Sequence, residues 1–172
     1  TFDPLSPADL EDKLARAAAA AATYRLTSVD DRIGWLRAAA DVLDRETDDV
    51  ARLMTLEMGK TLSAAKAEAT KCARALRYYA EHGPAFLLPQ PADAEAVGAK
   101  QAYVIYQPIG VVLAIMPWNF PLWQVVRFAA PALMAGNVGL LKHASNVPQT
   151  ALRLQDVLTE AVQMTLRAYR AR

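Results

Sequence analysis

The chain has 172 residues, of which 53% are hydrophobic and 22% charged, and its 19 basic and 18 acidic residues leave a formal net charge of +1. This length suits one domain or the larger part of one, and the balanced charge argues against a polyanionic partner such as a nucleic acid. Apolar runs broken well short of about 20 residues argue against a membrane span. A soluble chain is predicted, and a homo-oligomer that covers its apolar patches is favoured.

The cysteine content indicates whether the chain can form disulfides and which redox compartment suits it. Cys72 is the only cysteine, so no disulfide can form within the chain, and a reducing, cytoplasmic setting is predicted. Cys72 lies on the apolar face of a predicted helix, which indicates a buried, inert thiol. His82 and His143 stand apart from other ligand types, so no metal site is predicted. The first residues lack a basic segment leading into an apolar one, so no signal peptide is expected.

Helix signals dominate the first hundred residues. Ser6 and Ser28 each precede a run with helical spacing and an acid in the first turn, as N-cap residues do. Thr47 is predicted to cap a third helix. A fourth helix is predicted over residues 63–80, and the glycine and prolines of residues 83–91 break the pattern after it.

Strand signals follow. Residues 102–106 are β-branched and aromatic, as strands prefer. Residues 111–115 form a wholly apolar run with the length of a buried parallel strand. Beyond them the pattern gives a helix over 121–133, a short apolar strand over 138–141 and a helix from about Pro148. This alternation of strand and helix predicts the start of a parallel nucleotide-binding sheet.

Four motifs occur along the chain. The longest is Gly-Val-Val-Leu-Ala-Ile-Met-Pro-Trp-Asn-Phe-Pro-Leu at residues 110–122, an apolar strand that runs into Pro-Trp-Asn-Phe-Pro. The others are Glu-Met-Gly-Lys at 57–60, Pro-Ala-Leu-Met-Ala-Gly-Asn at 131–137 and Leu-Leu-Lys-His-Ala-Ser at 140–145. Together they resemble the aldehyde dehydrogenase family, and within it the NADP-dependent succinate-semialdehyde dehydrogenases, over about residues 1–158.

The resemblance implies an α/β fold in which N-terminal helices and a strand ribbon lead into the start of a parallel Rossmann-like sheet, an incomplete aldehyde dehydrogenase fold. Residues 1–100 would form the helical part of the cofactor-binding domain, and residues 101–158 the strand ribbon and the first part of the sheet. Residues 159–172 depart from the family, with no glycine or proline and with apolar positions at helical spacing. They are interpreted as a prolonged helix, a frameshifted or vector-derived tail, or two segments joined together.

Asn119 is the catalytic candidate. It comes just after the predicted strand, at the end where open α/β sheets bind ligands. In the family this asparagine donates its side-chain amide to the oxygen of the aldehyde under attack, as part of an oxyanion hole. The alternative is an asparagine that caps the helix opened by Pro121. The surrounding motif favours the catalytic role.

The resemblance also implies the cofactor site. Lys142 follows a buried strand, and in the family this lysine bonds the adenosine ribose hydroxyls. Three residues on, NAD-preferring members carry glutamate, which repels a 2′-phosphate, whereas this chain carries Ser145, which can donate to one. NADP is therefore expected in preference to NAD. Cofactor contacts are assigned to Pro117, Trp118, Asn119, Lys142, Ala144 and Ser145, with helix capping as an alternative role for Ser145.

Arg127 is the substrate candidate. It lies eight residues after Asn119, where the resemblance places an arginine that binds the carboxylate of succinate semialdehyde, and a guanidinium suits a carboxylate by bidentate geometry. Trp123 would wall the substrate tunnel. The alternatives are an arginine on an exposed helix face and a core tryptophan.

The family's nucleophilic cysteine and general-base glutamate have no counterpart in the chain, so the chain is interpreted as truncated and is not expected to turn over alone. Two alternatives remain open. One is a dehydrogenase for another aldehyde, with Arg127 merely exposed. The other is a truncated, non-catalytic helical or assembly module.

Overall fold

The structure is a computed structural model that describes Phe2 and residues 4–170, with side chains described as far as residue 165. In chain order its elements are α1 (Pro7–Tyr24), α2 (Val29–Arg45), α3 (Thr47–Met58), α4 (Leu62–Phe86), β1 (Gln90–Pro91), the 3₁₀ helix η1 (Glu95–Val97), β2 (Tyr103–Val104), β3 (Val111–Met116), α5 (Trp123–Met134), β4 (Val138–His143) and α6 (Pro148–Arg170). Helices thus precede strands, as predicted, and α6 runs to Arg170, into the stretch for which a prolonged helix was one interpretation.

Two of the three predicted helix caps are present. Ser6 and Ser28 each form a capping box with the acid three residues on, which satisfies backbone N–H groups that helix ends leave unpaired. The prediction for Thr47 is wrong. Glu46 is the N-cap of α3, and the Thr47 hydroxyl donates to the Leu43 carbonyl at 2.9 Å. The reason is that α2 and α3 are almost continuous, so no extended residue stands between them to cap.

Helix α4 extends six residues beyond its predicted end at residue 80, to Phe86. Gly83 and Pro84 lie in its last turns rather than stopping it. Gly83 is required by packing, because a Cβ at this position would overlap the side chain of Met134 on α5. The glycine therefore marks a close approach of two helices, which a local pattern cannot distinguish from a helix end.

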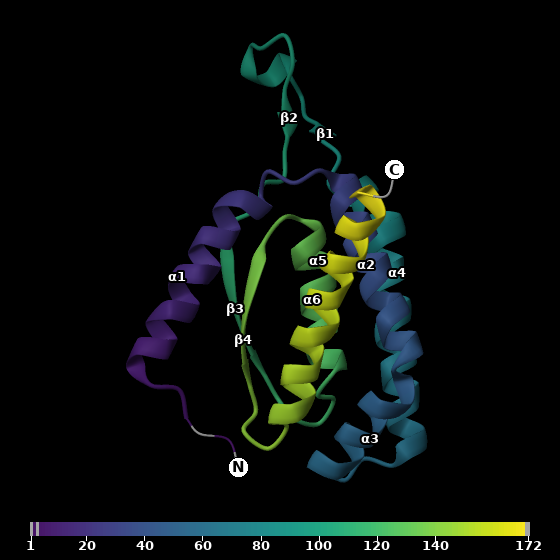
Figure 1. The fold of residues 1–172 in the computed structure, drawn as a ribbon. Helices are drawn as coiled ribbons and strands as arrows, with labels where there is room; N and C mark the ends of the chain where they lie inside the picture. Colours follow the sequence, from purple (N-terminus) through teal and green to yellow (C-terminus); the bar gives the residue numbers. More distant parts are fainter. Residues whose placement is uncertain (1, 3, 171–172) are drawn as a thin grey trace.

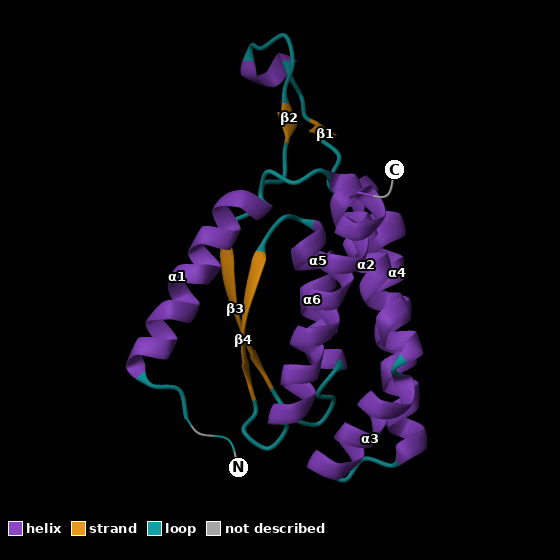
Figure 2. Cartoon of the chain, in the orientation of Figure 1, coloured by secondary structure: helices purple, strands orange, loops and turns teal. Residues whose placement is uncertain are grey.

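Strands β3 and β4 form a parallel pair, in register from Val111 opposite Val138 to Met116 opposite His143, which confirms the predicted start of a parallel sheet. Helix α1 lies on one side of this pair and α5 and α6 lie on the other (Figure 1). Strands β1 and β2 form a separate antiparallel hairpin that projects from the body (Figure 2). The ladder of β2 covers only two residues of the strand predicted at 102–106.

A single apolar core joins the helical region to the sheet helices. Helix α2 packs against α4 and α6, and α4 also packs against α3 and α5. The largest fully buried side chains come from all of these helices and from the loops that precede α5 and α6: Leu43, Met54, Leu76, Leu122, Met134 and Val147 among them. The N-terminal helices thus form the platform on which α5, and with it the loop that precedes α5, is held.

Candidate functional site

The loop between β3 and α5 carries the predicted catalytic residue. Pro117, Trp118, Asn119 and Phe120 are all exposed at the carboxyl end of β3. The N-cap residue of α5 is Leu122, and it makes no side-chain cap. Asn119 therefore does not cap the helix, which removes the structural alternative considered for it. Its amide is left at the end of the sheet where parallel folds bind ligands.

The N-terminus of α5 is instead capped from another helix. One carboxylate oxygen of Glu68, on α4, accepts from the backbone N–H groups of Leu122 at 3.0 Å and Trp123 at 2.9 Å. The Glu68 side chain is 2% exposed, so a negative charge is buried at the positive end of the helix. The sequence pattern gave no signal for this contact, because the partners are 54 and 55 residues apart.

Lys60 completes the arrangement around the loop. Its ammonium pairs with the other carboxylate oxygen of Glu68, donates to the Asn119 carbonyl at 3.2 Å and lies 3.9 Å from the centroid of the Phe120 ring. Lys60 is the last residue of the Glu-Met-Gly-Lys motif, which the sequence identified without assigning it a role.

His143 joins the end of β4 to the same loop. Its Nδ1 accepts from the Ala144 N–H at 2.8 Å, so the ring carries its proton on Nε2 and donates it to the Pro121 carbonyl at 2.8 Å. Sequence reasoning treated this histidine as isolated. The contact holds together the two segments in which all predicted cofactor residues lie.

Lys142 and Ser145 are both exposed, and Ala144 between them is half-buried. Lys142 stands opposite Ile115 in the parallel register, so the two side chains share one face of the sheet. Ser145 does not cap α6, which was the alternative role considered for it. Helix α6 is capped by Glu57, whose carboxylate accepts from the N–H groups of residues 149 and 150 at 2.6 and 2.8 Å.

Arg127 is exposed, and no ion pair involves it in the described part of the chain. It lies four residues after Trp123, so both project from one face of α5. Trp123 is half-buried against the core, and the ammonium of Lys71 lies 3.8 Å from its ring centroid. One face of α5 thus carries Trp123 and the exposed, unpaired guanidinium of Arg127. The ammonium of Lys71, from α4, covers the ring of Trp123.

Cys72 is fully buried in the core. Burial raises the pKa of its thiol well above the usual range, and the negative charge of Glu68 raises it further. A thiol that is neither ionised nor accessible is a poor nucleophile. Cys72 is therefore a core residue, in line with its place on the apolar face of α4.

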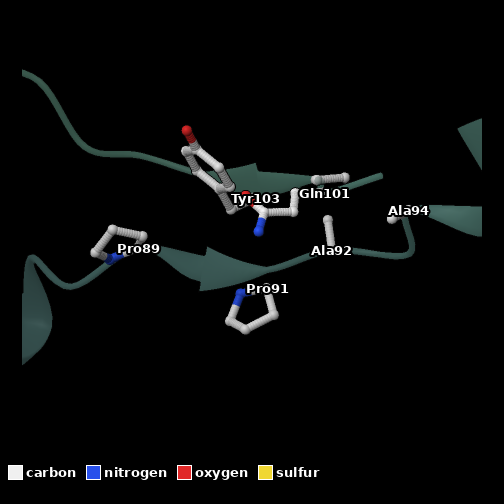
Figure 3. Close-up of a pocket in the computed structure, with 7 residues that line it drawn as sticks. Pro89, Pro91, Ala92, Ala94, Gln101 and Tyr103 are labelled. Carbon is white, nitrogen blue, oxygen red and sulfur yellow. The ribbon is translucent and has the colours of Figure 1, made fainter. Parts of the chain in front are cut away.

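A shallow hollow lies on the hairpin of β1 and β2, away from the residues described above (Figure 3). It is lined by Pro89, Pro91, Ala92, Ala94, Gln101, Ala102 and Tyr103. These side chains offer no acid, base or nucleophile suited to the predicted chemistry.

None of the helices in residues 4–170 combines the length and apolar character needed to cross a bilayer.

Comparisons with known proteins agree with the motifs. The model of the aldehyde dehydrogenase family matches residues 1–164. A succinate-semialdehyde dehydrogenase [NADP(+)] of Mycobacterium avium is 61% identical over 160 residues, which are 92% of this chain and 34% of that protein. A succinate-semialdehyde dehydrogenase [NADP(+)] 1 of Mycobacterium tuberculosis is 62% identical over 158 residues, which are 92% of this chain and 35% of that protein.

Solved structures give the same answer. The succinic semialdehyde dehydrogenase of Streptococcus pyogenes, solved with NADP⁺, superposes with a TM-score of 0.87 and 36% identity over 94% of this chain and 35% of that one. An aldehyde dehydrogenase of Brucella melitensis gives a TM-score of 0.84 and 33% identity over 93% of this chain and 33% of that one. The chain spans about a third of the length of the relatives it matches. On the family match, the identities and the shared fold, the chain belongs to the aldehyde dehydrogenase family.

Proposed function

We propose that this chain supplies the oxyanion donor, the ribose contacts and the substrate arginine of an NADP-dependent succinate-semialdehyde dehydrogenase. The reaction converts the aldehyde, water and NADP⁺ into succinate, NADPH and two protons. The observation that carries the proposal is a hydrogen bond between the loop after β3 and the end of β4. The His143–Pro121 bond at 2.8 Å keeps the segment of Asn119 beside the segment of Lys142 and Ser145.

The residues present fit a 2′-phosphorylated dinucleotide. Lys142 and Ser145 are exposed donors, and no carboxylate stands between them in the chain. An ammonium and a hydroxyl suit a phosphate, whereas a carboxylate here would repel it. When bound, NADP accepts a hydride from the substrate. The residues of this chain would hold its adenosine end and leave Asn119 to face the reacting carbonyl.

The substrate proposal depends on Arg127. An exposed, unpaired guanidinium beside a half-buried tryptophan suits an aldehyde whose far end is a carboxylate. The rival proposal, a dehydrogenase for an uncharged aldehyde, would make this arginine dispensable. The two proposals therefore differ in what removal of one side chain does to specificity.

The test uses a full-length hybrid, in which residues 1–158 of this chain replace the matching segment of the Mycobacterium avium relative. In the hybrid, Arg127→Ala is expected to lower kcat/KM for succinate semialdehyde about 10- to 100-fold, the equivalent of losing charged hydrogen bonds. Activity towards butanal should stay unchanged, and Arg52→Ala, which removes an exposed cation from α3, should change neither. Equal losses on both aldehydes would exclude a carboxylate-binding role for Arg127.

Cofactor preference is tested separately in the same hybrid. Ser145→Glu is expected to raise KM for NADP at least about tenfold, because it places a carboxylate against the 2′-phosphate, and to leave KM for NAD within a few fold. Gln155→Glu adds the same charge at an exposed position of α6 and should leave both constants unchanged. An unaltered NADP/NAD ratio in the Ser145 variant would rule out this residue as the selector.

We also propose that the protein acts in the cytoplasm as a homo-oligomer. A buried free thiol is compatible with a reducing compartment. Tyr103, Val104, Ile105 and Tyr106, in and after β2, are each at least half exposed on the projecting hairpin, and an apolar arm of this kind favours burial against another copy.

A further inference from the structure

The backbone carbonyl of Asn119 and two backbone N–H groups that follow it are held by one buried ion pair. Lys60 donates to the Asn119 carbonyl at 3.2 Å, and Glu68 accepts from the N–H groups of Leu122 and Trp123 at 3.0 and 2.9 Å. The side chains of Lys60 and Glu68 are only 11% and 2% exposed. Asn119 is exposed, and in the described residues only its backbone carbonyl, not its side chain, forms a hydrogen bond. Its amide is therefore placed through the backbone.

We propose that Lys60 and Glu68 are positioning residues for the oxyanion donor, acting through the backbone of residues 119–123. The inference rests on the proposed function, since an oxyanion donor matters only if the protein carries out the reaction. An oxyanion donor must stay within about 0.5 Å of its productive position to stabilise the transition state. The ion pair sets this position from α4 and from the turn before it, outside the loop.

Capping the N-terminus of α5 does not by itself require a buried ion pair such as Lys60–Glu68. A helix N-terminus is capped well by a serine, threonine or asparagine without burying any charge, and burying a carboxylate together with an ammonium costs desolvation energy that the pair only partly recovers. The arrangement also goes beyond a cap. The ammonium reaches past the carboxylate to the Asn119 carbonyl and to the Phe120 ring, neither of which belongs to α5.

The decisive experiment is a double-mutant cycle in the full-length hybrid. The variant Lys60→Met with Glu68→Gln removes both charges together and keeps an amide oxygen for the N–H groups of residues 122 and 123. It is expected to lower kcat about 10- to 100-fold, the size of effect that a misplaced catalytic group produces, with KM for NADP within about twofold. In an Asn119→Ala background the same change should cost less than about twofold, because no amide remains to be positioned.

The control is a second ion pair, which forms no hydrogen bond or ion pair with the loop in the described residues. Arg153 on α6 pairs with Glu46 before α3, and Arg153→Met with Glu46→Gln should leave kcat unchanged both with and without Asn119. If the Lys60 and Glu68 changes instead cost the same factor in both backgrounds, or cost nothing in kcat, the positioning role is overturned. An inactive unmutated hybrid would overturn the proposed function rather than the placement of the loop.

A second arm uses the 172-residue chain and needs no activity. In the Lys60→Met, Glu68→Gln variant, amide hydrogen exchange at Leu122 and Trp123, whose N–H groups donate to Glu68, should accelerate at least about tenfold, while exchange in α2 and α6 stays unchanged. Unaltered exchange at these residues would show that the loop keeps its position without the pair and would overturn the inference, whatever the hybrid does.

Discussion

Replacing Glu68 by alanine is expected to lower the free energy of unfolding of the chain by about 3–5 kcal/mol, the usual cost of removing one partner of a buried ion pair. The change leaves the Lys60 ammonium, 11% exposed, without its carboxylate. It also leaves the N–H groups of Leu122 and Trp123 without their acceptor. Thermal unfolding followed by circular dichroism should show a midpoint lowered by roughly 10 °C for a chain of this length.

Two matched variants separate the causes. Glu68→Gln keeps an oxygen for both N–H groups and should cost clearly less than the alanine variant, because only the charge is lost. Glu81→Ala removes an exposed carboxylate from the same helix and should change stability by less than about 0.5 kcal/mol. A Glu68→Ala protein as stable as the Glu81→Ala protein would show that the buried pair contributes nothing to the fold.

The sequence predicted the elements whose causes are local. Ser6 and Ser28 were identified as caps because a capping box lies within four residues. The apolar run that became β3 is likewise readable by itself. The end of α4 at Phe86 was missed because Gly83 serves a contact with Met134, 51 residues along the chain, rather than a helix stop.

In the candidate site too, residues within local motifs were predicted and long-range contacts were not. Asn119 and Lys142 were identified because a family motif surrounds each of them. The contacts that hold their loops were not predicted, although Glu57 and His143 lie within two of the motifs. Each of these contacts acts on backbone far along the chain: Glu68 on the start of α5, Glu57 on the start of α6 and His143 on Pro121. Local patterning carries no information about such contacts, since any exposed or buried acid of a helix has the same local signature.

Arg32 makes a similar long-range contact with backbone at the C-terminal end of α5. Arg32 is 7% exposed, and its guanidinium forms no ion pair in the described residues. Instead it donates to four backbone carbonyls and one hydroxyl, those of Tyr24, Arg25, Thr27 and Met134. Carbonyls at the ends of α1 and α5 are thereby satisfied by one side chain, where helix ends otherwise leave them unpaired.

Gly136 shows how tightly this arrangement is packed. Its φ of +88° is favourable only for glycine, and a Cβ would lie 2.9 Å from both terminal nitrogens of Arg32. The chain then turns into β4, which begins two residues later at Val138. Arg32 therefore ties the end of α1 to the point where the chain re-enters the sheet, and so to the strand that carries Lys142.

Arg32→Ala is expected to lower the free energy of unfolding by at least about 3 kcal/mol, because several buried carbonyls lose a charged donor at once and each lost bond costs about 1–3 kcal/mol. Urea unfolding followed by fluorescence measures this loss. Arg37→Ala removes an exposed arginine from the same helix and should cost less than about 0.5 kcal/mol. Arg32→Lys should recover only part of the loss, since an ammonium cannot reach carbonyls on both sides as a planar guanidinium does. Equal stability of the Arg32 and Arg37 alanine variants would mean that water satisfies these carbonyls as well as the guanidinium does, and that β4 is positioned by sheet pairing alone.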